Sequence, residues 1–311
     1  MPIHIKFSKG VTVMLSINDV KGVIPPIITP VDSEENVDKA GLQRVIDHVI
    51  DGGVHGVFVL GSNGEFYAFD YENQKRAVEI TVEHVNKRVP VYAGASAITT
   101  KECVKLAKLA EEIGADAVTV LTPMFIRPNE NEMYEHFKTI AKSTNLPVLL
   151  YNNPDKTTNN ISVLLLEKLS QIDNIVGIKN TSLNFSQTIE YIRVTKNNPS
   201  FRVLSGSDYT IFGTLAYGGA GCVAGTANVA PKLVVEIYEK FIAGDLEGAL
   251  NAQFKLIPLR NTYNYGSFPV VMKDCLNLLG LQVGNPVKPI DHCSQERLDD
   301  LKKVLSDLEL L

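Results

Sequence analysis

The sequence contains few cysteines and no motif that would bring them together. Cys103, Cys222, Cys275 and Cys293 lie far apart and form no C-x-x-C pair. This spacing favours neither a zinc site nor a disulfide framework, so we expect reduced thiols and a cytoplasmic protein. The six histidines show no H-x-x-x-H spacing, which gives no support to metal catalysis or a Ser–His triad. We therefore expect no metal and no cofactor.

Runs of like charge and long apolar stretches are also absent. The chain has 30 Lys and Arg against 35 Asp and Glu, a formal net charge of -5 at pH 7, and no run of its basic residues is longer than two. This charge pattern gives no indication that the protein binds nucleic acid or an anionic membrane. No stretch is long and apolar enough to suggest a signal peptide or a membrane span. These absences favour a small-molecule partner.

The sequence does contain a repeated pattern of short apolar runs and longer amphipathic segments. Eight runs begin near Gly22, Gly56, Val89, Asp116, Leu146, Asn174, Phe201 and Gly221. Their continuous Val, Ile and Leu interiors indicate parallel strands covered on both faces. The alternation predicts an α/β fold, a (β/α)₈ TIM barrel. The alternative, a doubly wound open sheet, usually has fewer strands and a G-x-G-x-x-G turn after the first one, which this sequence lacks.

The pattern changes near residue 230. Beyond it we find only segments of helical period, over residues 231–243, 246–263, 268–280 and 294–310, and Pro231 suits a first helical position. No linker composition separates the two parts. We therefore predict an N-terminal extension (residues 1–21), a barrel (residues 22–230) and a C-terminal helical region packed on the barrel (residues 231–311).

Polar residues at the ends of the apolar runs are the candidates for function, because TIM barrels build their sites at the carboxyl ends of the strands. Lys179 ends the sixth run, where burial favours the neutral amine that attacks a carbonyl. It could instead reach solvent or pair with Glu65. Tyr151 ends the fifth run and could relay a proton, or simply pack its ring.

A glycine-flanked turn, residues 61–65, ends the second run. Its backbone N–H groups, with Ser62 and Asn63, could hold a carboxylate. The alternative is a strand-to-helix connection that needs glycine for its backbone angles. The pattern alone leaves both interpretations open.

Four motifs at these ends give the sequence a resemblance to a known family. They are Gly61-Ser62-Asn63-Gly64-Glu65, Tyr151-Asn152-Asn153-Pro154, Val176-Gly177-Ile178-Lys179 and Ser205-Gly206-Ser207-Asp208. From about residue 22 to residue 288, the chain resembles the dihydrodipicolinate synthase / N-acetylneuraminate lyase family of pyruvate-dependent class I aldolases. This resemblance implies a TIM barrel and a cofactor-free lyase.

The resemblance also implies roles for individual residues. Lys179 would form the Schiff base with pyruvate, and Tyr151 would carry protons. Ser62, counted with them as catalytic, would hold the pyruvate carboxylate together with Asn63. The expected substrate contacts are Asn63, Gly61, Thr181, Asp208, Ser207, Gly225 and Lys156.

Departures from the family pattern bear on the second substrate. Where the branch that makes the lysine precursor has Thr-Thr, Arg and a Tyr lent by a neighbouring subunit, this chain has Ser62-Asn63, Lys156 and Phe125. Lysine does not replace the bidentate grip of arginine on a carboxylate. The neuraminate lyase branch has an acidic residue and a serine where this chain has Tyr209 and Gly225.

The expected function is therefore a pyruvate-dependent aldolase that makes or cleaves a C–C bond between pyruvate and an aldehyde. The favoured substrate is a 2-keto-3-deoxy sugar acid or a 4-hydroxy-2-oxo acid. The alternatives are a dihydrodipicolinate synthase-type condensation, N-acetylneuraminate cleavage, a dehydratase of the same family and a non-catalytic regulator that binds a keto acid. The resemblance to this family also implies a homo-oligomer, either a tetramer or a dimer.

Overall fold

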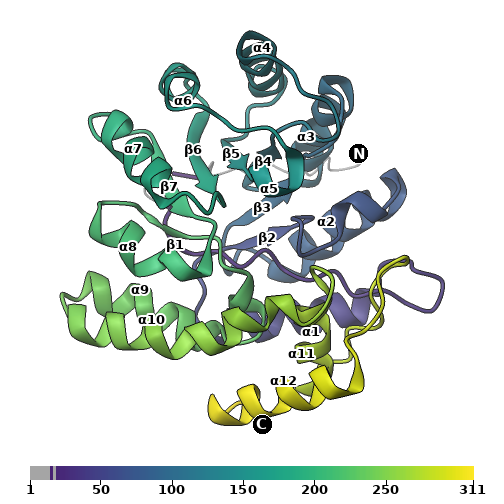
Figure 1. Ribbon diagram of the computed structural model, residues 1–311. Helices are drawn as coiled ribbons and strands as arrows, with labels where there is room; N and C mark the ends of the chain where they lie inside the picture. The colour runs from purple at the N-terminus through teal and green to yellow at the C-terminus, as the bar shows by residue number, and fades with distance from the viewer. Residues whose placement is uncertain (1–14, 17–18) are drawn as a thin grey trace, which may run out of the picture.

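The computed structural model describes residues 15–16 and 19–311 of the chain (Figure 1). Most of the predicted N-terminal extension, residues 1–21, lies outside the described residues. Across the described residues, no helix combines the length and the apolar character needed to cross a membrane.

Eight parallel strands form the centre of the molecule (Figure 1). They are β1 (Gly22–Val23), β2 (Val57–Val59), β3 (Val91–Gly94), β4 (Ala117–Leu121), β5 (Val148–Asn152), β6 (Ile175–Asn180), β7 (Arg202–Ser205) and β8 (Gly221–Cys222). Their order is β1-β8-β7-β6-β5-β4-β3-β2. A parallel bridge between Pro26 and Phe58 joins the two ends of this order, and Ile27 N donates to Phe58 O at 2.9 Å. The predicted TIM barrel is confirmed.

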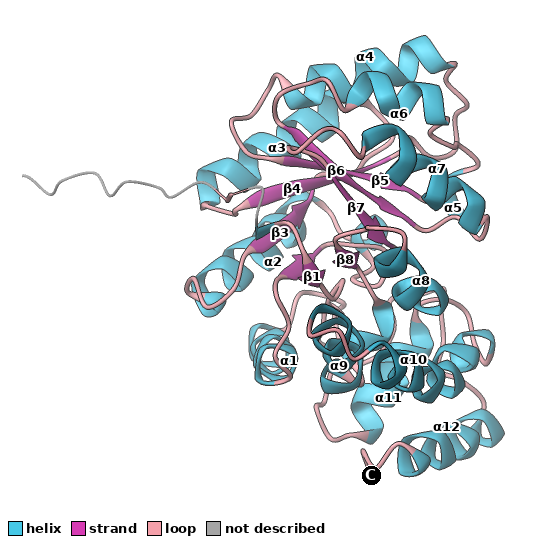
Figure 2. Cartoon of the chain, turned by 90° about the vertical axis from the view of Figure 1, so that its left-hand side faces the viewer, coloured by secondary structure: helices cyan, strands magenta, loops and turns pink. Residues whose placement is uncertain are grey.

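Helices surround the strands, as the two perpendicular views show (Figures 1 and 2). They are α1 (Lys39–Asp51), α2 (Tyr71–Val85), α3 (Thr100–Ile113), α4 (Glu130–Ala141), α5 (Pro154–Thr157), α6 (Val163–Leu169), α7 (Phe185–Thr195) and α8 (Ile211–Ala216). Side-chain caps set several starts: Asp70, Thr99 and Asn129 each accept a backbone N–H from the first turn of the helix that follows. Gly114, at φ 93°, ends α3.

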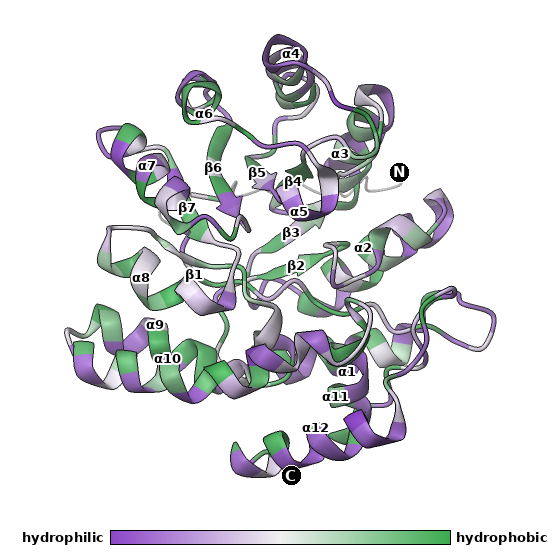
Figure 3. Ribbon diagram, viewed as in Figure 1, coloured by the Kyte–Doolittle hydropathy of each residue, from purple (hydrophilic) through white to green (hydrophobic). Residues whose placement is uncertain are grey.

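The apolar core has two layers. The larger layer lies between the strands and the helices. The smaller fills the barrel and takes one residue from each strand or the position after it: Ile24, Phe58, Tyr92, Ala117, Leu149, Val176, Leu204 and Val223, together with Val20. Figure 3 shows the apolar strands inside a ring of helices with hydrophilic outer faces. The interior is therefore packed, and a ligand must bind at an end of the barrel.

The C-terminal region consists of α9 (Pro231–Ile242), α10 (Leu246–Asn261), α11 (Val270–Leu278) and α12 (Gln295–Asp307). α9 contacts β1, α8 and α10, while α12 packs on α11. The turn η5 (Thr262–Asn264) continues α10. The predicted helices are present, with ends a few residues shorter than the pattern suggests. The boundary at residue 230 stays a prediction.

Candidate active site

Lys179 and Tyr151 lie side by side at the carboxyl ends of two neighbouring strands. They are paired in register between β5 and β6. The Lys179 Nζ lies 3.8 Å from the centre of the Tyr151 ring and 5.3 Å from that of Phe58. Both residues are 3% exposed. The alternative in which Lys179 reaches solvent or pairs with Glu65 is wrong, because the lysine is buried and Glu65 pairs with Lys273.

The Tyr151 hydroxyl is held by neighbouring polar groups. Asn153 Nδ2 donates to it at 3.0 Å, and the Ser62 hydroxyl lies 3.4 Å away. Burial alone would raise the pKa of the Tyr151 phenol, but the Lys179 ammonium and hydrogen bonds with Ser62, Asn153 and Lys179 outweigh it and lower that pKa. Tyr151 therefore exchanges its proton more readily than an ordinary buried tyrosine.

The turn after β2 presents Ser62 and Asn63 to this pair. Both residues are 6% exposed, and Asn63 Oδ1 is buried without a hydrogen-bond partner. The turn packs closely on the barrel, since a Cβ on Gly61 would lie 2.9 Å from the Phe58 ring. Gly61 thus supports the turn from behind, whereas Asn63 faces the cavity described next.

A cavity of about 140 Å³ opens above Lys179 at the carboxyl ends of the strands. Its walls contain eight of the ten predicted site residues: Lys179, Tyr151, Asn63, Thr181, Asp208, Ser207, Gly225 and Lys156. Ser62 reaches it only through Tyr151, and Gly61 does not line it. Four buried polar atoms in its wall have no hydrogen-bond partner: Asn63 Oδ1, Thr181 Oγ1, Tyr263 Oη and Arg260 Nε. Such atoms are costly unless a ligand satisfies them, which indicates a polar ligand.

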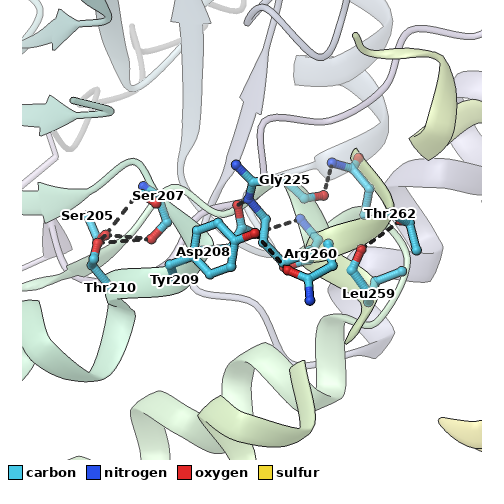
Figure 4. Close-up of polar contacts among 12 residues, drawn as sticks. Ser205, Ser207, Asp208, Tyr209, Thr210, Gly225, Leu259, Arg260 and Thr262 are labelled. Carbon is cyan, nitrogen blue, oxygen red and sulfur yellow. Dashed lines mark hydrogen bonds and ion pairs between the residues drawn. The ribbon is translucent and has the colours of Figure 1, made fainter. Parts of the chain in front are cut away.

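The far wall of the cavity centres on Asp208. Its Oδ1 accepts the backbone N–H of Thr226 at 2.9 Å and the Thr226 hydroxyl. Its Oδ2 lies 3.8 Å from Arg260 Nε (Figure 4). Lys156, by contrast, is exposed at the mouth, with its Nζ 5.2 Å from the centre of the Phe268 ring.

The sequence pattern does not predict the part of the wall that comes from the C-terminal region. Arg260, Tyr263 and Phe268 come from the end of α10 and the segment after it, about 80 positions beyond Lys179. The one available signal was an arginine directly after the buried Leu259, in a helix predicted to pack on the barrel. Only the fold shows that this helix ends at the mouth of the barrel.

Other cavities of the described structure lie away from these residues. A larger cavity, about 440 Å³, lies between α1, the start of α9 and residues 308–310, and contains none of the site residues. Among residues 15–16 and 19–311, no three His, Cys, Asp or Glu side chains gather as a metal site would require.

Comparison with known proteins gives a family that agrees with the fold and with the Lys179–Tyr151 pair. The dihydrodipicolinate synthetase family matches residues 19–308. The chain belongs to this family. It is therefore a lyase of the pyruvate-dependent class I aldolase group, whose members act through a Schiff base, and the predicted resemblance is confirmed.

Individual members of the dihydrodipicolinate synthetase family match nearly the whole chain. A 4-hydroxy-tetrahydrodipicolinate synthase of Archaeoglobus fulgidus is 35% identical over 291 residues, 94% of this chain and 99% of that protein. YagE, a prophage protein of the dihydrodipicolinic acid synthase family from E. coli K12, was solved in complex with pyruvate; it has a TM-score of 0.90 at 31% identity, over 94% of this chain and 99% of its own. A monomeric dihydrodipicolinate synthase variant has a TM-score of 0.91 at 30% identity, over 95% and 99%.

Proposed function

We propose that this chain is a pyruvate-dependent aldolase in which Lys179 forms the Schiff base and Tyr151 transfers protons. The observation that carries the proposal is the buried Lys179 amine, 3.8 Å from the ring of Tyr151 in the wall of a polar cavity. The pyruvate bound to YagE supports pyruvate as one substrate.

The chemistry follows from this arrangement. The neutral Lys179 amine attacks C2 of pyruvate, and the carbinolamine loses its hydroxyl as water after receiving a proton from Tyr151. The resulting protonated imine withdraws electrons from C3, whose proton passes to the Tyr151 phenolate, and an enamine forms. The enamine carbon then attacks an aldehyde, whose oxygen takes a proton from Tyr151, and water releases the product from Lys179. Cleavage runs through the same steps in reverse.

The turn after β2 is suited to the pyruvate carboxylate. The Ser62 hydroxyl and the Asn63 amide can both donate hydrogen bonds, and neither carries a charge that would repel an anion. Asn63 lies in the cavity wall with its side-chain carbonyl unpartnered, so its side chain is not committed elsewhere in the protein. Ser62, through its contact with Tyr151, links the bound carboxylate to the proton carrier.

For the second substrate we propose the aldehyde of a 2-keto-3-deoxy sugar acid or a 4-hydroxy-2-oxo acid. The second candidate is the condensation named for the Archaeoglobus relative, 4-hydroxy-tetrahydrodipicolinate synthesis. Lys156 and Phe125 disfavour that candidate, because lysine lacks the planar donor fork of arginine and phenylalanine carries no hydroxyl to relay a proton. A panel of aldehydes, each assayed for pyruvate consumption, decides between them.

Borohydride reduction in the presence of pyruvate tests the reaction class. We expect peptide mass spectrometry to locate a pyruvyl adduct on Lys179 and the adduct to disappear in Lys179→Ala. Lys156→Ala is the matched control, since Lys156 lines the same cavity and should leave the adduct intact. Folded wild-type protein without an adduct would exclude the imine route and favour a non-catalytic keto-acid-binding barrel.

We also propose that the chain assembles as a homo-oligomer, a tetramer or a dimer. The support is an exposed apolar residue at the same end of the barrel, Phe125, which is 92% exposed. The monomeric family variant shows that a barrel of this kind can also exist alone, so the assembly has to be measured.

A further inference from the structure

Arg260 is a largely buried guanidinium that lies against two tyrosine rings. Its Cζ lies 4.6 Å from the centre of the Tyr209 ring and 4.2 Å from that of Tyr263, and its side chain is 18% exposed. Tyr209 is itself fixed, because its hydroxyl donates to Asn261 Oδ1 at 2.7 Å. These two ring contacts hold the guanidinium in place, and its N–H groups remain available for hydrogen bonds.

The Arg260 guanidinium has no hydrogen-bonding partner among the described residues. Its Nε is buried and unpartnered. Its nearest charge is Asp208 Oδ2, 3.8 Å from Nε (Figure 4). A buried donor without an acceptor is costly. Since Arg260 lines the catalytic cavity, a ligand there is the available acceptor.

The neighbours of Arg260 indicate which acceptor fits. Asp208 is 3% exposed and offers Oδ2 as an acceptor, and Thr181 Oγ1 and Tyr263 Oη are both unpartnered. A ligand hydroxyl can accept from Arg260 and donate to Asp208 at the same time. A ligand carboxylate on Arg260 would instead lie beside the Asp208 carboxylate, and like charges repel strongly away from water.

We propose that Arg260 is a specificity-determining residue that binds a hydroxyl of the aldehyde half, so the enzyme prefers an uncharged hydroxyaldehyde to an aldehyde with a carboxylate tail. The proposal rests on the proposed aldolase function and names the substrate class of that same cavity. It gives the C-terminal helical region a direct role in catalysis, through a residue more than 80 positions away from Lys179.

The test separates the pyruvate half of the reaction from the aldehyde half. Exchange of pyruvate methyl protons in D₂O, followed by NMR, reports the pyruvate half of the site, which comprises Lys179, Tyr151 and the turn after β2, and needs no aldehyde. Pyruvate consumption is then measured with three aldehydes. Glyceraldehyde carries hydroxyls, succinic semialdehyde carries a carboxylate, and propionaldehyde carries neither group. The variants are Arg260→Met and Arg260→Lys, with exposed Arg193→Met on α7 as the matched control.

In wild type we expect glyceraldehyde to be the best of the three substrates. Arg260→Met should lower kcat/KM for glyceraldehyde about 10- to 100-fold, the value of a hydrogen bond to a charged donor, and leave that for propionaldehyde and the proton exchange unchanged. Arg260→Lys, which keeps the charge without the planar fork, should show a smaller loss. If Arg260→Met loses the exchange of pyruvate protons, Arg260→Lys is the variant in which the three aldehydes are compared.

Two results would overturn the inference while leaving the aldolase function intact. One is that both Arg260 variants retain proton exchange and prefer glyceraldehyde as strongly as the wild type does. The other is a wild-type preference for succinic semialdehyde that Arg260→Met abolishes. Absence of proton exchange in the wild-type enzyme would instead remove the proposed function itself.

Discussion

At the level of single residues, the catalytic pair depends on mutual electrostatics. Tyr151 is buried, and the pKa of its phenol is nevertheless lowered because the charge of Lys179 and hydrogen bonds with Ser62, Asn153 and Lys179 outweigh the effect of burial. Aromatic and amide groups hold both side chains, so neither has to move far for a proton to pass between them. Such preorganisation is what proton transfer requires.

Replacing Lys179 by Met should raise the pKa of Tyr151 above its ordinary value. Burial, the largest influence and one that raises the pKa, remains, while the charge and hydrogen bond of Lys179 are lost; only Ser62 and Asn153 still lower it. The measurement is an ultraviolet titration of tyrosinate, with Tyr151→Phe subtracted. The control is Lys168→Met, at an exposed position on α6. An unchanged Tyr151 titration in Lys179→Met would show that the two groups are not coupled.

Asn63→Asp should weaken pyruvate binding without unfolding the enzyme. The change keeps the shape of the side chain but places a carboxylate where the substrate carboxylate is proposed to bind. We expect KM for pyruvate to rise at least about 10-fold, the loss of one charge-assisted hydrogen bond or more. Steady-state kinetics check this, with exposed Asn197→Asp as control. A normal KM would place the carboxylate elsewhere.

At the level of secondary-structure elements, a buried ion pair connects the turn after β2 to α11. Lys273 is 0% exposed and pairs with Glu65, whose Oε1 accepts the backbone N–H of Val287 at 2.9 Å. Lys273 also donates to Asn285 O at 2.9 Å. Burial lowers the pKa of Lys273 more than Glu65 raises it. The pair therefore positions the turn that carries Ser62, and it fixes that turn to the C-terminal region.

Lys273→Met should destabilise the protein by about 3–5 kcal/mol, because it leaves the Glu65 carboxylate buried without a counter-charge. The double variant Glu65→Gln, Lys273→Met should lose less than the sum of the two single changes, since neither charge is then left alone. Equilibrium urea unfolding measures both effects. Additive losses would mean that the two side chains do not depend on each other.

The sequence predicts elements better than contacts between them. The continuous apolar runs locate all eight strands because parallel strands are covered on both faces, and the motifs at their ends locate Lys179 and Tyr151. Neither of two contacts can be predicted from runs and motifs. One is the ion pair of Lys273 with Glu65, and the other is the place of Arg260 in the cavity wall. Both depend on where α10 and α11 cross the barrel mouth, and no local pattern encodes that position.

At the level of the whole molecule, the carboxyl ends of β2, β3 and β4 present large exposed apolar side chains. The loops after these neighbouring strands expose Tyr67, Ile98 and Phe125, which are 51%, 44% and 92% exposed. Phe125 has a φ of 71°, in the left-handed region that costs a non-glycine residue about 1–2 kcal/mol. Asn159 Nδ2 donates to Pro123 O and Ile126 O at 2.7 and 2.6 Å. The loop is thus held so that Phe125 points outward.

A side chain presented outward at such cost is best explained by self-association through this face. We therefore expect the protein to sediment as an oligomer, and Phe125→Asp to shift it toward the monomer, since burying one phenylalanine contributes roughly 1.5–3 kcal/mol for each copy. Sedimentation velocity over a range of concentrations measures the shift, and exposed Leu164→Asp on α6 is the matched control. If Phe125→Asp dissociates the oligomer and Leu164→Asp does not, the interface includes the loops after β2 to β4. A wild-type monomer at all concentrations would contradict the prediction, and the enzyme would then resemble the monomeric family variant in its assembly.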